Sequence, residues 1–275
     1  MSEAPRRSVP TMLVTIIALA FLFLPPVVVV LFSFHSSASL TFPFEGFSLR
    51  WYDEVLGSPE FRAAARNSLV VATATSAVTL VLGTLTAYGL TRSRSRWRVP
   101  LTLMFFLPVT LPGIFLGLAL LVFFAEVTLP LSLLTVFIAH CLFVFPFFLL
   151  MAQAALSRTD PALEEAAADL GASRAMVFRR VTLPQIWPVL LGAAALAFAL
   201  SFDEFIITFF VVGPDSTLPM YVWGGLRRNT DPSINTVSTL LLIATTVPCL
   251  IAYVLAVRPR SRKRRDRLDL RDGIA

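Results

Sequence analysis

The sequence is poor in charged residues, cysteine and histidine. Charged residues make up 15% of the 275 positions, and the chain has two cysteines and two histidines. Cys141 and Cys249 both fall inside apolar stretches and lack the spacing of metal ligands, so we expect neither a disulfide nor a metal site. Two well-separated histidines also argue against a membrane-embedded enzyme, which needs His, Asp or Glu residues in a cluster.

A phosphate-binding loop of the form G-x-x-x-x-G-K-[ST] is also absent. The chain therefore does not hydrolyse ATP by the P-loop arrangement, and energy from ATP would have to come from a separate partner. No polar segment is long enough to form a soluble enzyme domain, and no convincing internal repeat is present. We expect no catalytic residues and no bound cofactor.

Apolar residues dominate what remains. They make up 56% of the chain, and the mean hydropathy is +0.78. This much apolar surface does not fit inside one soluble core, which indicates a membrane protein that crosses the bilayer several times. The net charge is +6. Because the cations lie between apolar runs, they indicate membrane topology and no nucleic-acid partner.

The apolar runs predict an all-α integral membrane protein that forms a single domain over residues 1–275. A helix rises 1.5 Å per residue, so each run must be about 20 residues long to cross a hydrocarbon core of ~30 Å. The first run exceeds the signal-peptide core of about 7–15 residues, so we interpret it as an anchor. The six predicted spans are approximately residues 11–34, 68–90, 101–124, 131–156, 185–212 and 234–257.

Three local patterns refine this layout. Trp51 and Tyr52 favour a membrane interface, so the loop over residues 35–67 is expected to contain a short interfacial helix. The third span is expected to be kinked, and it either lines a path through the membrane or uses its kinks only for packing. For His140, in the fourth span, we favour a hydrogen bond to a neighbouring helix over a ligand or proton-carrying role. The kink prediction rests on Pro108, Pro112, Gly113 and Gly117.

The basic residues predict which side of the membrane each loop faces. Most of the 23 Lys and Arg residues lie before the first span, after the second span, in the loop after the fourth span, or in the tail after residue 257. This excess places both termini in the cytoplasm. The basic tail is expected to bind anionic lipid. The opposite side holds Arg50, Arg62, Arg66, Arg227 and Arg228.

One long polar segment, residues 158–184, separates the fourth and fifth spans. Asp160 can cap a helix that begins at Pro161, and Gly171 can take the left-handed conformation that ends it. Ser173 can cap a second short helix. The apolar face of the first helix is predicted to consist of Leu163, Ala166, Ala167 and Leu170, with Glu164, Glu165 and Asp169 beside it. The segment therefore predicts a helix, a sharp turn and a helix at the membrane surface.

The spacing of this segment resembles the EAA loop of permease subunits of ABC importers, E-A-A-x3-G-x9-I-x-L-P. Only Val181, in place of isoleucine, departs from that pattern. In that family the loop is the cytoplasmic coupling helix, which sits in a groove of a separate ATPase subunit; we therefore call residues 158–184 the coupling loop. The residues assigned to coupling are Glu164, Glu165, Ala166, Ala167, Gly171, Val181, Leu183 and Pro184. The alternative is an ordinary amphipathic surface helix.

The flanking sequences resemble the spermidine/putrescine-type branch of the family. The resemblance implies the type I importer permease fold, a location in a bacterial-type inner membrane, and four kinds of partner. These are ATP-binding cassette subunits, a second permease subunit, an extracytoplasmic solute-binding protein and membrane lipid. A polyamine is the favoured solute. The alternative solutes are another small organic molecule or iron. The alternative class of protein is a secondary carrier driven by an ion gradient.

The residues that join the loop to the fifth span leave two interpretations open. Proline favours an extended residue before it, so Leu183-Pro184 is expected to mark a break between the surface helix and the span. A push on one element would then be felt by the other. The alternative is a simple helix start at Pro184.

Asp203 and Glu204 are adjacent carboxylates inside the fifth apolar run. At 1.5 Å per residue Asp203 lies about 27 Å along a helix that begins at Gln185, in the outer part of the membrane. In one interpretation Asp203 pairs with a cation such as Arg227 or caps a helix break near Ser201. In the other, at least one carboxylate faces the substrate path and attracts a cation. The aromatic rings that would assist are Phe202 and Phe205.

Overall fold

The computed structural model describes residues 9–37, 44–228 and 233–257. Apart from one isolated antiparallel bridge between His35 and Phe47, all regular structure in these ranges is helical. The chain forms two compact units, Met1–Ala65 with Leu218–Ile243, and Arg66–Thr217 with Ala244–Ala275. The predicted all-α fold class is confirmed.

The first unit contains short helices as well as apolar ones. Its elements are α1 (Val9–Phe32), α2 (Arg50–Gly57), the beginning of α3 (Pro59–Val78), α12 (Leu218–Arg228) and the beginning of α13 (Ser233–Val257). The expected short helix is α2, which buries Trp51, and the Trp51 indole Nε1 donates to the His35 carbonyl at 2.8 Å. Helix α12 was expected to be loop. It packs the Tyr221 ring against Phe61 at a centroid distance of 5.9 Å.

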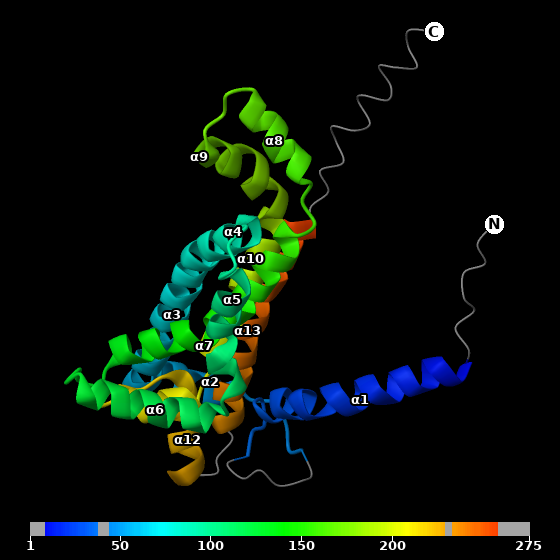
Figure 1. Ribbon diagram of the computed structural model, residues 1–275. Helices are drawn as coiled ribbons and strands as arrows, with labels where there is room; N and C mark the ends of the chain where they lie inside the picture. The colour runs from blue at the N-terminus through cyan, green and yellow to red at the C-terminus, as the bar shows by residue number, and fades with distance from the viewer. Residues whose placement is uncertain (1–8, 38–43, 229–232, 258–275) are drawn as a thin grey trace. The chain divides into compact units, whose positions relative to one another are not determined.

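The second unit contains the elements that position the coupling loop. They are the end of α3, the π-helical turn η1 (Thr79–Gly83), α4 (Thr84–Arg92), α5 (Arg98–Thr110), α6 (Gly113–Glu126), α7 (Leu133–Leu156), α8 (Pro161–Asp169), α9 (Arg174–Val177), the π-helical turn η2 (Phe178–Thr182), α10 (Leu183–Phe202), α11 (Ile206–Val211) and the end of α13. Figure 1 shows α8 and α9 as a pair beyond the ends of α4 and α10.

Five helical stretches in the described ranges are long and apolar enough to cross a membrane. They are Met12–Phe32, Pro59–Arg92, Leu133–Leu156, Arg174–Phe202 and Ser233–Leu255. Each overlaps a predicted span. The stretches Pro59–Arg92 and Arg174–Phe202 begin earlier than the predicted spans 68–90 and 185–212, because the polar residues before those spans continue the same helices.

The third predicted span is a bent pair of helices, α5 and α6, which meet at 102°. The cause is local. Leu111 adopts an extended conformation with φ −86° and ψ 134°, which is the conformation favoured before a proline such as Pro112. The predicted kink is confirmed, and the two helices together are long and apolar enough to count as a sixth span that is broken at residues 111–112.

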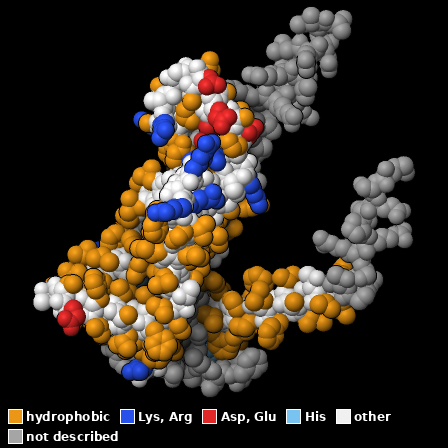
Figure 2. Space-filling model, viewed as in Figure 1, with side chains coloured by type: hydrophobic (Ala, Val, Ile, Leu, Met, Phe, Trp, Pro, Cys, Tyr) orange, Lys and Arg blue, Asp and Glu red, His pale blue; other side chains and the backbone are white. Residues whose placement is uncertain are grey.

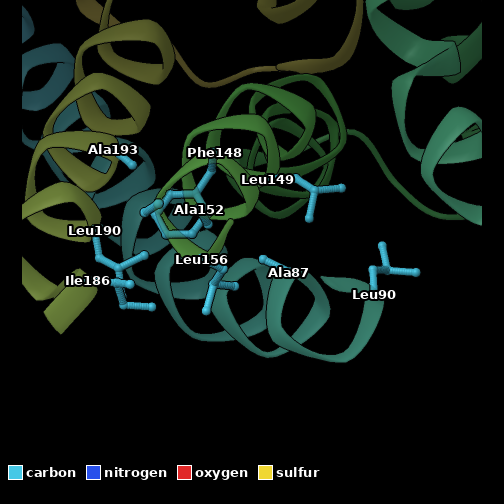
Figure 3. Close-up of a cluster of buried hydrophobic side chains, with 10 residues drawn as sticks. Ala87, Leu90, Phe148, Leu149, Ala152, Leu156, Ile186, Leu190 and Ala193 are labelled. Atoms are coloured by element: carbon cyan, nitrogen blue, oxygen red, sulfur yellow. The ribbon is translucent and has the colours of Figure 1, made fainter. Parts of the chain in front are cut away.

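Side chains of α4, α7 and α10 form the hydrophobic core of the second unit, as Figure 3 shows. This core lies next to both π-helical turns. At the end of η1 a Cβ on Gly83 would overlap the Phe148 ring, so close packing of η1 against α7 requires glycine. The core residues are Ala87, Leu90, Phe148, Leu149, Ala152, Ala155, Leu156, Ile186, Leu190 and Ala193.

Candidate coupling loop and substrate-path residues

Local capping signals fold the coupling loop as predicted. The Asp160 carboxylate accepts from the Ala162 backbone N–H at 3.0 Å, and Pro161 begins α8. Gly171 ends the turn with φ +83°. The Ser173 hydroxyl then accepts from the Met176 N–H at 3.4 Å and caps α9. Each of these signals acts within a few residues of sequence, and each prediction is confirmed.

Glu164 connects α8 to two other segments of the second unit. Arg92, the last residue of α4, donates from Nη2 to Glu164 Oε1 at 2.8 Å and from Nε to Oε2 at 3.1 Å. The Thr182 hydroxyl, at the end of η2, donates to Glu164 Oε1 at 2.9 Å. Arg92 Nη2 also donates to Thr159 Oγ1 at 2.6 Å. We call Arg92, Thr159, Glu164 and Thr182 the Arg92 cluster.

Three members of this cluster were not predicted from the sequence. Four arginines follow the second predicted span, Arg92, Arg94, Arg96 and Arg98, and as a run they indicate only the cytoplasmic side of the membrane. Thr159 and Thr182 have no predicted role. Glu164 and Arg92 are 72 positions apart, and no local pattern distinguishes Arg92 from Arg94. The signal that was available is position, because Arg92 is the arginine nearest to the second span and the only one of the four that belongs to α4.

The predicted apolar face of α8 is not covered by the rest of the described chain. Leu163 is 50% exposed and Leu170 is 89% exposed. Ala166 is exposed and Ala167 is half-buried, while Glu165 is exposed beside them. Charged side chains surround this end of the unit, whereas hydrophobic side chains cover much of the helices (Figure 2). The free face and the charges around it leave α8 open to contact with another protein.

A groove of about 480 Å³ runs between the end of α4 and the α8–α9 pair. Two of the residues assigned to coupling, the carboxylates Glu164 and Glu165, line it. The lining residues are Tyr88, Gly89, Arg92, Ser93, Glu164, Glu165, Ala168, Ala172, Arg174 and Val177. The groove shows that the Arg92 cluster lies at the surface of the loop and is accessible from one side.

Of the two interpretations left open at Leu183-Pro184, the break is wrong. The helix runs without interruption from Arg174 to Phe202, through α9, η2 and α10. Pro184 lies in the first turn of α10, and the wider π-helical turn before it loosens the backbone where the proline N–H is missing. Val181 and Thr182 belong to that turn. The second half of the coupling loop, from Arg174 onward, is therefore one helix with the fifth span.

A real break separates α10 from α11, at residues 203–205. Glu204 caps α11, because its carboxylate accepts from the Ile207 N–H at 2.8 Å. The cap that we considered for Asp203 is therefore formed by its neighbour. The Asp203 side chain is exposed and has no hydrogen bond or ion pair with any other described residue.

The two aromatic candidates have different surroundings. Phe202 is buried, with 1% exposure, and stacks on Phe198 at a centroid distance of 5.5 Å. Phe205 is half-buried and packs against Phe209 at 6.0 Å. The structure therefore brings Phe205 to the surface near Asp203 and Glu204, but not Phe202.

His140 bridges the break from α7. Its Nδ1 lies 2.8 Å from Ser201 Oγ on α10, and its Nε2 lies 2.8 Å from Thr208 Oγ1 on α11. The Thr208 hydroxyl donates to the Glu204 carbonyl, so Nε2 donates to Thr208 and Nδ1 accepts from Ser201. The predicted hydrogen-bonding role of His140 is confirmed, and it holds the two sides of the break together.

The sequence matches a protein family described as "Binding-protein-dependent transport system inner membrane component" over residues 79–265. It is 34% identical to the putrescine transport system permease protein PotI of Escherichia coli strain K12. That alignment covers 94% of this chain and 95% of the relative. The spermidine/putrescine transport system permease protein PotC of the same strain is 29% identical, over 86% of this chain and 90% of that protein.

Solved transporter structures have the same fold. A chain of a bacterial ABC transporter involved in the import of the acidic polysaccharide alginate matches with a TM-score of 0.74 and 16% identity. The match covers 92% of this chain and 95% of that chain. A chain of the MetNI methionine ABC transporter, in an inward-facing conformation, matches with a TM-score of 0.61 and 20% identity over 72% and 94% of the two chains. At these identities the likeness concerns the fold alone.

Proposed function

The chain belongs to the family of binding-protein-dependent transport system inner membrane components, and on that premise we propose that it is the permease subunit of a polyamine importer. ATP hydrolysis drives this importer, and the solutes are putrescine and spermidine. The similarity to two polyamine permeases supports the solute class. The observation that carries the assignment is the exposed carboxylate of Asp203, which has no cationic partner among the described residues.

Asp203 is the recognition element for a polycation, and Glu204 beside it caps α11 at the helix break. An ionised carboxylate inside a membrane costs on the order of 2.5–3.5 kcal/mol on insertion scales, so an unpaired one needs a compensating charge. A diammonium solute supplies it. Phe205 adds an aromatic face for an ammonium group, a contact that contributes about 0.5–2 kcal/mol.

The coupling loop docks a separate ATPase subunit. Leu163 and Leu170 offer the apolar surface, and Glu165 and the turn at Gly171 fix its position. The complete importer contains two ATPase subunits, a second permease subunit and an extracytoplasmic solute-binding protein. Both termini and the coupling loop face the cytoplasm. The terminal basic residues on which part of this orientation rests lie outside the described ranges.

Transport by the reconstituted complex tests this function. The chain is purified with its partner subunits and placed in vesicles. ATP is supplied on the side of the coupling loop, and the binding protein and solute are supplied on the opposite side. We expect ATP-dependent uptake of labelled putrescine and spermidine, but not of acidic amino acids or iron. Preference for an anion, or uptake driven by an ion gradient without ATP, would contradict the proposal.

A further inference from the structure

We propose that Arg92 is a positioning residue for energy coupling, because its ion pair with Glu164 makes the coupling loop and the inner ends of α4 and α10 move as one body. This inference rests on the proposed ATPase docking at α8. It assigns a mechanical role to an arginine that the sequence marked only as a determinant of topology.

The Arg92 cluster has the geometry of a strong and directional contact. Two nitrogens of the Arg92 guanidinium donate to the Glu164 carboxylate, and the Thr182 hydroxyl donates a further hydrogen bond to the same carboxylate. Charge-assisted hydrogen bonds of this kind are stronger than neutral ones. The two side chains are 23% and 13% exposed, so salt and water screen the pair less than an exposed surface pair.

The cluster is also the main polar connection between α8 and the membrane helices. No residue of α8 is buried, so packing alone holds this helix weakly. Arg92 ends α4, and Thr182, which is fully buried, ends η2 directly before α10. A displacement of Glu164 therefore pulls on two helices at once.

Behind the cluster, packing carries the displacement further. Leu90 on α4, Leu156 on α7 and Ile186 on α10 belong to one hydrophobic core, which begins within a turn of the cluster. The Tyr88 ring adds a contact to Phe178 of η2 at a centroid distance of 4.8 Å. Since a close-packed core transmits strain, the ends of these three helices follow the loop together.

A purely structural role for the pair would have a different signature. If Arg92 and Glu164 only hold the loop folded, their loss lowers assembly, ATP hydrolysis and transport in proportion. If they transmit motion, assembled complexes continue to hydrolyse ATP but import less solute per ATP. The ratio of solute imported to ATP hydrolysed therefore separates the two roles.

The experiment measures both quantities in the same vesicles, for wild type, Arg92→Gln and Glu164→Gln. Arg94→Gln is the matched control, because Arg94 is exposed and belongs to the same arginine run. We expect Arg92→Gln and Glu164→Gln to lower solute per ATP at least about fivefold, the lower end of typical coupling effects. The exchange Arg92→Glu with Glu164→Arg is expected to recover much of the ratio. Thr182→Val, which removes one hydrogen bond and keeps the ion pair, is expected to lie between.

Two results would overturn the inference. One is an unchanged ratio in assembled Arg92→Gln and Glu164→Gln complexes, and the other is an equal fall in Arg94→Gln. If the single charge variants do not assemble, the Thr182→Val complex decides, and a wild-type ratio there counts against the role. Failure of the proposed function looks different, because the wild type itself then shows no ATP-dependent polyamine uptake.

Discussion

Glu164, in the first turn of α8, and Asp203, directly after α10, are both carboxylates, and their surroundings are opposite. Glu164 accepts hydrogen bonds from an arginine and a threonine on two other elements and is largely shielded. Asp203 is exposed and has no polar partner within the described chain. The first charge is satisfied inside the protein and therefore fixes structure. We propose that the second binds the solute.

The neighbouring carboxylates reverse this pattern. Glu165, next to Glu164, is exposed, whereas Glu204, next to Asp203, caps α11. Each adjacent pair, Glu164-Glu165 and Asp203-Glu204, thus contains one carboxylate that is hydrogen-bonded within the described chain and one that is exposed, which we call the free member. We assign the free members to partners outside the chain, Glu165 to the ATPase and Asp203 to the solute. The predictions below test this division.

The largest effect is expected for Gly171→Val. Gly171 has φ +83°, and a Cβ there would meet no atom within 4 Å, so the penalty comes from the backbone and not from a clash. A β-branched residue in this region costs roughly 1–3 kcal/mol, which corresponds to about 5- to 150-fold in docking. We expect loss of ATPase co-purification and of uptake, with normal membrane insertion.

Gly192→Val is the control for Gly171→Val. Gly192 lies within α10, and a Cβ there also meets no atom within 4 Å, but its φ is not in the left-handed region. We expect normal co-purification and uptake for this variant. Normal uptake by Gly171→Val would remove the turn from the coupling mechanism.

The next effect concerns the free carboxylate at the break. Asp203→Asn keeps the shape of the side chain and removes its charge. A hydrogen bond to a charged group contributes about 1.5–3 kcal/mol, so we expect polyamine uptake at low concentration to fall about tenfold or more. The complex should assemble normally. Asp215→Asn, in the following loop, serves as the control, and equal losses in both variants would contradict a specific role for Asp203.

A smaller effect is expected at Glu204, where two substitutions separate the role of its charge from its role as the cap of α11. Glu204→Gln keeps an oxygen that can accept from the Ile207 N–H, whereas Glu204→Ala removes it. Loss of a helix cap costs about 0.5–2 kcal/mol. We expect Glu204→Ala to lower thermal stability in detergent clearly and Glu204→Gln to do so little, with only a mild effect of Glu204→Gln on uptake. A larger uptake defect for Glu204→Gln than for Asp203→Asn would reverse the assignment of the two residues.

The smallest effect is expected for Pro184→Ala. Because the helix from Arg174 to Phe202 is continuous, alanine fits the first turn of α10 without changing its course. We expect unchanged basal ATP hydrolysis and unchanged solute per ATP. A rise in hydrolysis without solute would show that the proline contributes to coupling after all.

The local parts of this structure follow from the sequence, and the long-range parts do not. Asp160, Gly171 and Ser173 act on backbone groups within a few residues, so their capping and turn roles were predicted. The pairing of Arg92 with Glu164 depends on how distant helices pack, and an arginine run gives no information about which member turns inward. Pro112 predicted a kink between α5 and α6, but the size of the bend, 102°, does not follow from the proline alone.

Two errors have identifiable physical causes. At Leu183-Pro184 the preference of the residue before proline for an extended conformation is overridden. A π-helical turn accommodates the proline there, and nothing in the local sequence announces such a turn. In α12 the turn-forming residues before Leu218 and the basic residues at its end suggested a loop, although Leu218, Tyr221 and Val222 have helical spacing.

One measurement tests the division between internal and free carboxylates most directly. Uptake of spermidine and hydrolysis of ATP are followed together, over a range of solute concentrations, for Arg92→Gln and Asp203→Asn. We predict that Arg92→Gln lowers solute per ATP at every concentration and leaves half-saturation unchanged. We predict that Asp203→Asn raises the half-saturating concentration and leaves basal hydrolysis unchanged. Identical defects in the two variants would contradict the account.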